Sequence, residues 1–313
     1  MKAAIVRGAG QSPVYADFEE PVAGAGEHLV TVRAAALAPL VRARASGAHY
    51  SASGQFPFVV GVDGVGVRED GQRVYFLLPR PPHGAMAERT VVAATHCIAV
   101  PEDLDDATAA AIANPGMSSW AAFVERAHLK AGETVLINGA TGASGRLAVR
   151  IARHMGAARV IATGRNVDLL SSLGADEIIA LNEEGDILEQ RFQAVFAAGV
   201  DVVVDYLWGM SAERMLAAAA KVGREGVPLR FVQVGNSSGA TINLPGAVLR
   251  SSAIEMTGSG IGSVTLSGLL RAVECLFRAA GAAALTLPIR TVPLAGVEQA
   301  WADGDSRRTV FIP

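Results

Sequence analysis

The sequence predicts an α/β fold with two domains, one rich in β-strands and one built on a doubly wound parallel sheet. The chain has 313 residues, of which 50% are hydrophobic and 18% charged, and this length favours two hydrophobic cores over one. Residues 1–110 alternate short apolar runs with Gly and Pro, which is typical of β-strands. From about Ile112 onward, strands, glycine turns and amphipathic helices alternate, as the crossovers of a parallel sheet require.

The β-rich part is predicted from four runs, "HLVTVRAAAL", "FPFVVGVDGVG", "QRVYFLLP" and "ERTVVAATHCIAV". After about Ser263 the chain holds one helical stretch, "LSGLLRAVECLFRAAG", and then two strand-like pieces, "LPIRTVPL" and "RRTVFIP". Between these parts six strands are expected, with helices between them: Thr134–Asn138, Arg159–Thr163, Glu177–Ala180, Asp201–Asp205, Arg230–Gly235 and Ile254–Thr257.

A glycine cluster follows the first of these strands. In "TVLINGATGASGRLAVRIARHMG" the strand is followed at once by Gly139, Gly142 and Gly145, and then by a helix with one apolar face. In such a setting Gly142 lets the backbone approach a pyrophosphate, Gly145 lets the helix pack on its strand, and the helix start offers unpaired N–H groups. Ala140 replaces the first fingerprint glycine. A dinucleotide site is favoured over a bare turn, and its predicted residues are Ala140, Thr141, Gly142, Ala143, Ser144 and Gly145.

The end of the next strand indicates which dinucleotide binds. An NAD site usually has Asp or Glu about 20 residues after the glycines, but here that place holds Arg165, in "TGRN". Thr163 can donate its hydroxyl, Gly164 opens room, and Arg165 can clamp a phosphate with two hydrogen bonds. NADP(H) is therefore favoured. The alternative is that Arg165 is an ordinary solvated arginine at a helix start.

Composition and charge exclude several classes of function. A formal net charge of −3 offers no basic surplus for nucleic acid. No apolar run is long enough to span a bilayer, and "MKAAIVRGAG" lacks the features of a signal peptide, so a cytoplasmic protein without a membrane partner is expected. Cys97 and Cys275 are the only cysteines and lie far apart, which favours two buried thiols over a disulfide or a CxxC metal site.

Several segments together resemble one family. "NGATGASG", "VIATGRN", "LGADEII", "VDVVVDYLWG", "FVQVGNSSG" and "LRSSAIEMTGSG" have the order and spacing seen in the medium-chain dehydrogenase/reductase superfamily, in its zinc-free quinone oxidoreductase branch. "GAMAERTVV" and "GVEQAWADGDSRRTVFIP" extend the resemblance over essentially the whole chain. The resemblance implies a GroES-like catalytic domain of residues 1–112 and 264–313, a Rossmann domain of residues 113–263, a cleft for NADPH, and commonly a homodimer joined through the last Rossmann strand.

A zinc-dependent reaction is not expected. Zinc-dependent relatives bind the metal with the His of a G-H-E motif and with cysteines, whereas this chain has Gly61-Val62-Asp63 at that place and too few cysteines. Six histidines remain, but no two have metal-ligand spacing on one element, and surface or core packing is the default for all except His49: His28, His49, His83, His96, His128 and His154.

The remaining chemistry is direct hydride transfer from nicotinamide to a quinone or to a C=C bond conjugated to a carbonyl. The resemblance places the nicotinamide near Ser118, in "NPGMSSW", and between two further segments, Val234-Gly235-Asn236 and Gly258-Ser259-Gly260. For Ser118 and Asn236, a helix cap and a turn residue remain equal alternatives.

The substrate side departs from the family pattern. The polar Asn and Asp of the family's N-P-x-D segment are replaced by Ala38 and Val41. Tyr50 is then the first candidate for donating a hydrogen bond or proton to the acceptor oxygen, with His49 second and Arg42 third.

Several alternatives stay open for the substrate side and for the function. Tyr50 can equally be a pocket wall, solvent can supply the proton, and Arg42 and Arg44 are more often solvated than functional. The chain can act on quinones or instead on enones and enoyl thioesters. It can also be an NADPH-binding protein with little turnover, because the family's Asn and Asp are lost.

Overall fold

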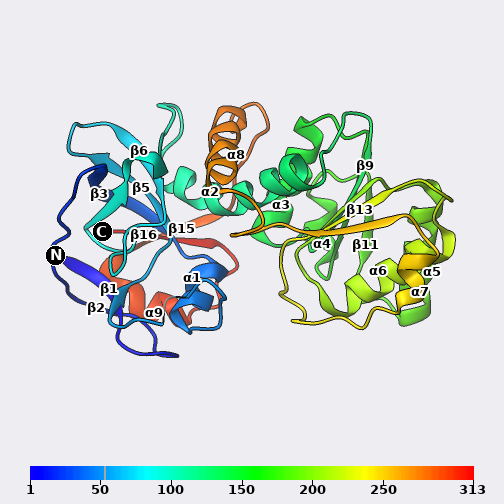
Figure 1. Cartoon of the computed structure of the whole chain (residues 1–313), viewed down its shortest axis with the longest axis horizontal. Coiled ribbons are helices and arrows are strands. Elements are labelled where there is room, and N and C mark those ends of the chain that lie inside the picture. Colours follow the sequence, from blue (N-terminus) through cyan, green and yellow to red (C-terminus); the bar gives the residue numbers. More distant parts are fainter. Residues whose placement is uncertain (53) are drawn as a thin grey trace. The chain divides into compact units, whose positions relative to one another are not determined.

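The computed structural model describes residues 1–52 and 54–313. The chain divides into two compact units. The first consists of Met1–Asn114, Val273–Ala280 and Thr286–Pro313, and the second of Pro115–Ala272 and Gly281–Leu285. The predicted α/β fold class is confirmed, because one unit is rich in β-strands and the other holds a parallel sheet (Figure 1). The domain boundaries expected after residues 112 and 263 stay a prediction.

The first unit contains a three-stranded sheet in the order β2-β1-β4 and a seven-stranded sheet in the order β15-β16-β3-β5-β6-β8, with β7 paired to β3. The last strand, β16, is antiparallel to β3 and parallel to β15, so both ends of the chain contribute to one sheet. The strands are β1 (Lys2–Val6), β2 (Val14–Asp17), β3 (Glu27–Ala36), β4 (Phe58–Val59), β5 (Asp63–Arg68), β6 (Arg73–Leu77), β7 (Arg89–Ala93), β8 (Cys97–Ala99), β15 (Ile289–Pro293) and β16 (Arg308–Ile312).

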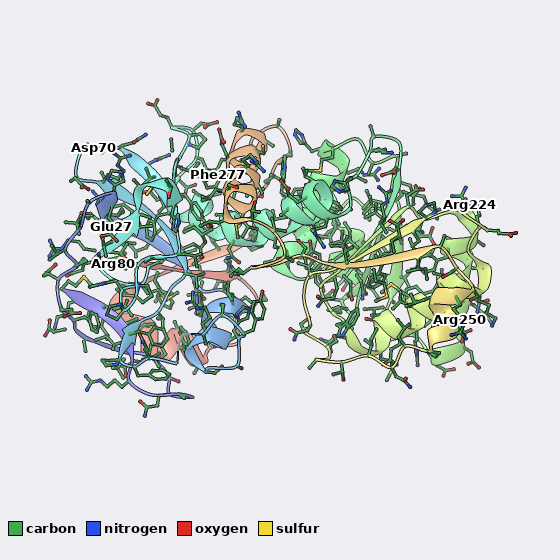
Figure 2. The ribbon with its side chains drawn as sticks, in the orientation of Figure 1. Glu27, Asp70, Arg80, Arg224, Arg250 and Phe277 are labelled. Atoms are coloured by element: carbon green, nitrogen blue, oxygen red, sulfur yellow. The ribbon has the colours of Figure 1, made fainter. Side chains whose placement is uncertain are left out.

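Alternation along β3 places the core of the first unit. Val30 and Val32 are buried, whereas Thr31 and Arg33, which alternate with them, are exposed, as the period of two in a strand requires. Outside this core, Tyr75 of β6 and Phe277 meet edge to face, with 5.8 Å between ring centroids. Figure 2 shows Phe277 on the helix α8 (Leu266–Ala279). The same figure labels Arg80 and Glu27, whose side chains form an ion pair at 2.6 Å.

Two helices of the first unit are not foreseen from the sequence, where no element is expected at either segment. α1 (Pro39–Ala45) has 7 residues and α9 (Val297–Ala302) has 6, so neither is long enough to show a helical period. Pro39 stands in the first turn of α1, where its missing N–H costs nothing. α2 (Asp106–Ala121) and α8 each continue from one unit into the other along the chain.

The second unit is built on a six-stranded parallel sheet in the order β11-β10-β9-β12-β13-β14. Numbered along the chain this order is 3-2-1-4-5-6, the doubly wound arrangement of dinucleotide-binding domains. All six predicted strands are confirmed, with ends that agree within two residues. They are β9 (Thr134–Asn138), β10 (Arg159–Gly164), β11 (Glu177–Ala180), β12 (Val202–Asp205), β13 (Leu229–Gln233) and β14 (Ile254–Gly258).

The helices between these strands bury their apolar faces against the sheet. On the apolar face expected for α3, Leu147, Ala148, Ile151 and Ala152 are all fully buried, whereas Met155, the last residue expected there, is only partly buried. The other helices are α4 (Val167–Ser171), α5 (Gly185–Ala198), α6 (Gly209–Val222) and α7 (Gly246–Arg250), and α3 itself is Ala143–His154. Within residues 1–52 and 54–313, no helix is long and apolar enough to cross a membrane.

Candidate cofactor and substrate sites

The residues predicted to bind the cofactor lie in the second unit and gather at one edge of its sheet. With the exception of Ser118, which is in α2, each follows or ends a strand at its carboxyl end. Ligands of doubly wound sheets bind at this edge. After β9 come Ala140, Thr141, Gly142, Ala143, Ser144 and Gly145; at the end of β10 are Thr163, Gly164 and Arg165; after β13 come Val234, Gly235 and Asn236; and at the end of β14 are Gly258 and Ser259.

The glycine turn has the geometry that a phosphate site needs. A Cβ atom on Gly145 would stand 2.4 Å from the carbonyl oxygen of Gly139, so only glycine allows α3 to start this close to its strand. A Cβ on Gly142 would meet nothing nearer than that same oxygen, at 3.6 Å. Gly145 is therefore required for packing, whereas the space beside Gly142 is open to a ligand.

The start of α3 leaves backbone donors without partners inside the helix. Gly142 is the N-cap residue and no side chain caps this end. The first N–H to bond back into the helix is that of Arg146, which donates to the carbonyl of Gly142 at 2.9 Å. The N–H groups of Ala143, Ser144 and Gly145 are thus the orphan donors of a first turn, and such donors fit a pyrophosphate.

A buried hydrogen-bond network holds the turn from beneath. The amide of Asn138 donates to the Asp205 carboxylate at 2.7 Å and to the Ser211 hydroxyl at 2.9 Å. The Thr163 hydroxyl donates to Asn138 Oδ1 at 2.6 Å and accepts from the N–H of Gly139 at 3.2 Å. Thr163 is fully buried, and its hydroxyl is engaged with the sheet rather than directed to solvent. Its expected contact with a 2′-phosphate therefore stays a prediction that this geometry does not support.

Arg165 is exposed at the end of β10, immediately before the short helix α4. Asn166 caps that helix by accepting from the N–H of Leu169 at 3.0 Å. The room expected at Gly164 is filled by Thr141, since a Cβ there would lie 2.8 Å from the Thr141 methyl group. Arg165 is therefore an exposed cation at the carboxyl end of β10, where a ligand can reach it.

Ser118 lies inside α2 and contacts the glycine turn. Its hydroxyl donates to the carbonyl of Pro115 at 2.9 Å and to the Ser144 hydroxyl at 3.3 Å. Next to it, the fully buried Ser119 donates to the carbonyl of Ser144 at 3.0 Å and lies 2.7 Å from the Tyr206 hydroxyl. Ser119 and Tyr206 are not among the residues predicted from the sequence. The signal for Tyr206 was its place directly after β12, at the same edge as the other strand ends.

The segment after β13 also approaches Tyr206. A Cβ on Gly235 would stand 2.6 Å from the Tyr206 carbonyl oxygen, so glycine is required here for backbone approach. Asn236 is exposed, and the N–H of Ser259 donates to the Gln233 carbonyl at 2.8 Å. The structure thus brings the ends of β12, β13 and β14 together.

In the first unit, His49 and Tyr50 form a ring pair, with centroids 4.2 Å apart and planes at 32°. Tyr50 is 72% exposed. His49 Nδ1 accepts from the N–H of Ser51 at 3.1 Å, so the neutral ring carries its proton on Nε2. Burial and the neighbouring Arg44 lower the pKa of His49, which makes this neutral form the one present near pH 7.

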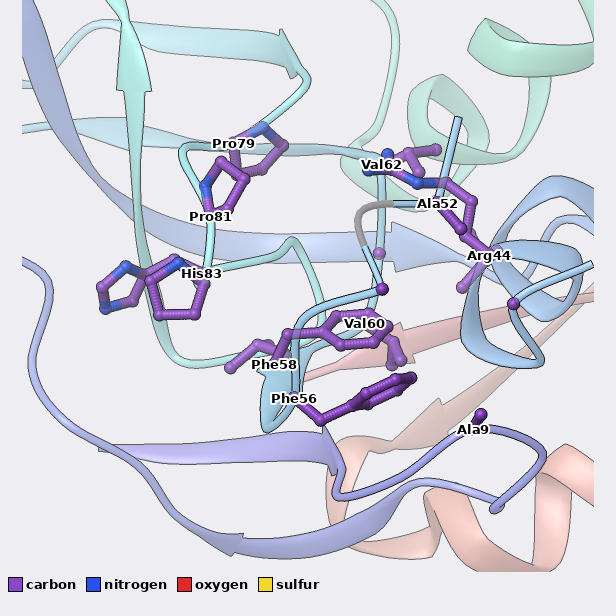
Figure 3. A pocket seen from close by; sticks show the side chains of 16 residues that line it. Ala9, Arg44, Ala52, Phe56, Phe58, Val60, Val62, Pro79, Pro81 and His83 are labelled. Carbon is purple, nitrogen blue, oxygen red and sulfur yellow. The ribbon is translucent and has the colours of Figure 1, made fainter. Parts of the chain in front are cut away.

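Arg42, the third candidate donor, is engaged with α9. Its guanidinium donates to the carbonyl of Trp301 and lies 5.3 Å from the centre of that ring. Arg44 instead lines an apolar pocket of about 300 Å³ within the first unit (Figure 3). This pocket is not predicted from the sequence, and its wall also includes Phe56 and Phe58.

Asp63, at the position of the Glu in a G-H-E motif, is buried in a cluster with Tyr75 and Arg308. It accepts from the Tyr75 hydroxyl at 3.1 Å, and burial raises its pKa to about 6 although Arg308 lowers it. Val62 beside it is 3% exposed and has no donor atom for a metal. In the described ranges 1–52 and 54–313, no three or more His, Cys, Asp or Glu side chains form a group that could hold a metal ion.

Comparisons with known proteins agree with this geometry. A family model described as zinc-binding dehydrogenase matches residues 143–274. A probable NADPH-dependent quinone reductase, tdiC of Emericella nidulans, is 30% identical over 96% of each chain. Trans-enoyl reductase pgmF of Aspergillus terreus is 32% identical over 53% of this chain and 45% of its own. The quinone oxidoreductase of Thermus thermophilus, solved also with NADPH, is 27% identical, with full coverage of both chains and a TM-score of 0.82.

Proposed function

Because this chain belongs to the medium-chain dehydrogenase/reductase superfamily, in its NADPH:quinone oxidoreductase branch, we propose that it is an NADPH-dependent reductase of quinones or of alkenes conjugated to a carbonyl. The observation that carries the proposal is the similarity to a quinone reductase along 96% of both chains. The geometry of the glycine turn supports the cofactor, and the apolar pocket of the first unit offers a place for the acceptor.

The cofactor is held by residues of the second unit. The open backbone at Gly142 and the first-turn N–H groups of α3 bind the pyrophosphate. Arg165 binds the 2′-phosphate, because a guanidinium can give two charge-assisted hydrogen bonds to it. Thr163 acts as a positioning residue, since its hydroxyl bonds hold Gly139 and Asn138 in place. Ser118, Asn236 and Ser259 complete the site around the nicotinamide.

Bound NADPH supplies a hydride, and the protein must stabilise the charge that develops on the acceptor oxygen. Tyr50 donates a hydrogen bond to that oxygen in this proposal. His49 is the second donor, because its Nδ1 is occupied by the Ser51 N–H and its Nε2 carries the proton. The Tyr50 hydroxyl and the His49 Nε2–H can each donate a hydrogen bond to the oxygen on which the charge develops.

The reaction proceeds without zinc in this proposal. The zinc-binding dehydrogenase model matches residues 143–274, whereas the G-H-E position lies outside that range. There Val62 cannot ligate a metal, and Asp63 is committed to Tyr75 and Arg308. Burial also raises the pKa of the Cys97 thiol to about 11, which disfavours the thiolate that zinc requires. This donor set does not fit a catalytic zinc ion.

A homodimer is part of the same proposal. β14 is the edge strand of the six-stranded sheet, paired on one side with β13. An edge strand offers backbone groups that a second copy can extend. Light scattering coupled to size-exclusion chromatography tests this: a mass about twice the 32.3 kDa of one chain supports the dimer, and a single-chain mass contradicts it.

A second acceptor class has an observation of its own. The similarity to a trans-enoyl reductase over 53% of this chain favours enones and enoyl thioesters as alternatives to quinones. A third possibility is an NADPH-binding protein with little turnover, because Ala38 and Val41 replace the polar residues of the family pattern.

One assay separates these functions. NADPH absorbance is followed with quinones, enones, aldehydes and an enoyl thioester, each with and without a chelator, and the panel is repeated with NADH. Turnover of quinones or enones that the chelator leaves unchanged, with NADPH preferred, supports the reductase. Tight NADPH binding without turnover of any acceptor supports the binding protein, and loss of turnover with chelator contradicts the zinc-free reaction.

A further inference from the structure

Two arginines of α1 have different surroundings. Arg42 and Arg44 are two positions apart on the helix, so their side chains leave it in different directions. Arg42 is bound to the carbonyl and ring of Trp301. Arg44 lines the apolar pocket instead, and in Figure 3 its side chain rises from α1 and extends towards Val62.

Arg44 is a half-buried cation without an anionic partner in the described part of the chain. Burial lowers its pKa, and no carboxylate counteracts this effect. Other arginines of the same unit do have carboxylate partners: Arg68 with Asp70, Arg73 with Asp106, Arg80 with Glu27, Arg89 with Glu20 and Arg290 with Asp303. A desolvated and unpaired guanidinium is costly for the fold, and it gains most from an anion that enters the pocket.

The rest of the pocket suits a flat apolar body. The rings of Phe56 and Phe58 lie 5.5 Å apart at 47°, and Pro79, Pro81 and Pro82 line the wall as well. A cavity of about 300 Å³ is at the small end of ligand pockets. It therefore fits a compound of one or two rings better than a long acyl chain.

We propose that Arg44 makes this pocket selective for planar ring compounds that carry an anionic group, a carboxylate or a sulfonate. The guanidinium binds the anion through two parallel hydrogen bonds while the phenylalanine and proline side chains hold the ring. An uncharged analogue of the same shape contacts the same lining side chains but leaves the Arg44 guanidinium desolvated and without an anion. Binding of these anionic ring compounds to the pocket does not require a cofactor. Only their reduction, as hydride acceptors, rests on the proposed function.

The first test measures binding without turnover. Calorimetry compares 2-naphthoate with naphthalene-2-carboxamide, a matched redox-inert pair, on the full-length protein with and without NADP⁺. The acid is expected to bind at least tenfold more tightly than the amide, since a hydrogen bond to a charged group is worth about 10- to 100-fold in affinity. Equal affinities of acid and amide, or no binding of either, overturn the proposal.

Variants test whether Arg44 is the residue that causes the preference for the acid over the amide. Arg44→Met should bring the acid-to-amide ratio close to one, and Arg44→Lys should leave an intermediate ratio, because a lysine keeps the charge but not the planar fork. Arg33→Met is the matched control: it removes one exposed arginine of the same unit and should leave the ratio unchanged. Because each ratio is measured within one variant, partial unfolding cancels. A preference that survives in Arg44→Met contradicts the proposal.

Turnover gives a second and separable measurement. The ratio of kcat/KM for 1,4-naphthoquinone-2-sulfonate to that for 1,4-naphthoquinone is compared between the wild type and Arg44→Met, so that intrinsic reactivity cancels. A fall of about tenfold or more is expected, and an unchanged ratio shows that Arg44 does not select acceptors. If no acceptor is reduced but naphthoate binding depends on Arg44, the proposed reductase function fails and the anion site stands.

Discussion

The side-chain amide of Asn138 donates a hydrogen bond to the carboxylate of Asp205, with 2.7 Å between Nδ2 and Oδ1. The two residues are register partners at the ends of the adjacent strands β9 and β12, and both are fully buried. The carboxylate also accepts from the N–H groups of Leu207 and Trp208. The pair therefore fixes the two strand ends between which the glycine turn begins.

Replacing Asn138 by leucine should lower the free energy of unfolding by about 3 kcal/mol, because a buried carboxylate loses a donor and the Thr163 hydroxyl loses its acceptor. Urea unfolding followed by circular dichroism measures this change. Asn182→Leu is the control, since Asn182 lies after β11 in the same unit, outside the network. A stability equal to that of the control would show that the network does not hold the strand ends.

The two glycines of the turn should respond differently to valine. Gly142→Val should keep the melting temperature and abolish NADPH binding, because its Cβ lies 3.6 Å from the nearest protein atom, the Gly139 oxygen, and fills the space beside the backbone that a ligand needs. Gly145→Val should lower the melting temperature as well, since its Cβ would meet the Gly139 carbonyl at 2.4 Å. Thermal unfolding and NADPH fluorescence titration distinguish the two. If Gly142→Val bound NADPH with unchanged affinity, the glycine cluster would be a turn between strand and helix and not a phosphate site.

Arg165→Ala should narrow the preference for NADPH over NADH by about 10- to 100-fold, because the 2′-phosphate loses charge-assisted hydrogen bonds worth about 1.5–3 kcal/mol each. Dissociation constants of both nucleotides measure it. Arg250→Ala is the matched control (Figure 2), because Arg250 is exposed before β14 and thus at the opposite end of the strands. Equal affinity of the wild type for NADH and NADPH would contradict the assignment of the cofactor.

Tyr75→Phe should destabilise the protein in a pH-dependent way. Burial raises the pKa of Asp63 to about 6, so the folded state favours the protonated carboxyl, and this contribution to stability is lost as pH rises from about 4 to 6. Above pH 6 the Tyr75 hydroxyl donates to an ionised acceptor. Removing it should cost about 1 kcal/mol at pH 4.5 and about 2 kcal/mol at pH 8. Urea unfolding at both pH values tests this, with Tyr15→Phe as control, and a cost independent of pH would argue against the ionised form.

The sheet of the second unit was predictable because each strand appears in the sequence as a short, nearly continuous apolar run followed by a turn. The residues at which the strands end were harder to predict. β13 was expected to continue to Gly235, yet the N–H groups of Val234 and Gly235 turn to the Asp205 carbonyl instead. That choice depends on a neighbouring strand, and no local pattern encodes it.

Site residues can be predicted from the sequence where they belong to one continuous motif. They cannot be predicted where distant segments of the chain come together. Gly142, Gly145 and Arg165 are predicted from their spacing along one βαβ unit, and the structure places them at the carboxyl ends of β9 and β10. Thr163 is expected from the sequence to donate its hydroxyl to a 2′-phosphate, but this hydroxyl is buried and donates to Asn138. The pocket around Arg44 combines residues of several segments, among them Phe56 and His83, and only the folded chain brings these together.

Tyr50 tests how the acceptor oxygen is stabilised. If its hydroxyl bonds that oxygen as charge develops, Tyr50→Phe removes an interaction that is stronger in the transition state than in the ground state, while the ring and its contact with His49 remain. The value of kcat/KM for a conjugated enone should fall by about ten- to a thousandfold with NADPH affinity unchanged. Quinones should lose less, since their reduced anions are already stable. Tyr15→Phe, a phenol of the same unit, should change neither value. An enone rate equal to the wild type would show that Tyr50 does not donate to the acceptor oxygen. The proton would then come from water, and the oxyanion would be stabilised by His49, a backbone N–H or the nicotinamide ribose; the same loss in His49→Phe would identify His49.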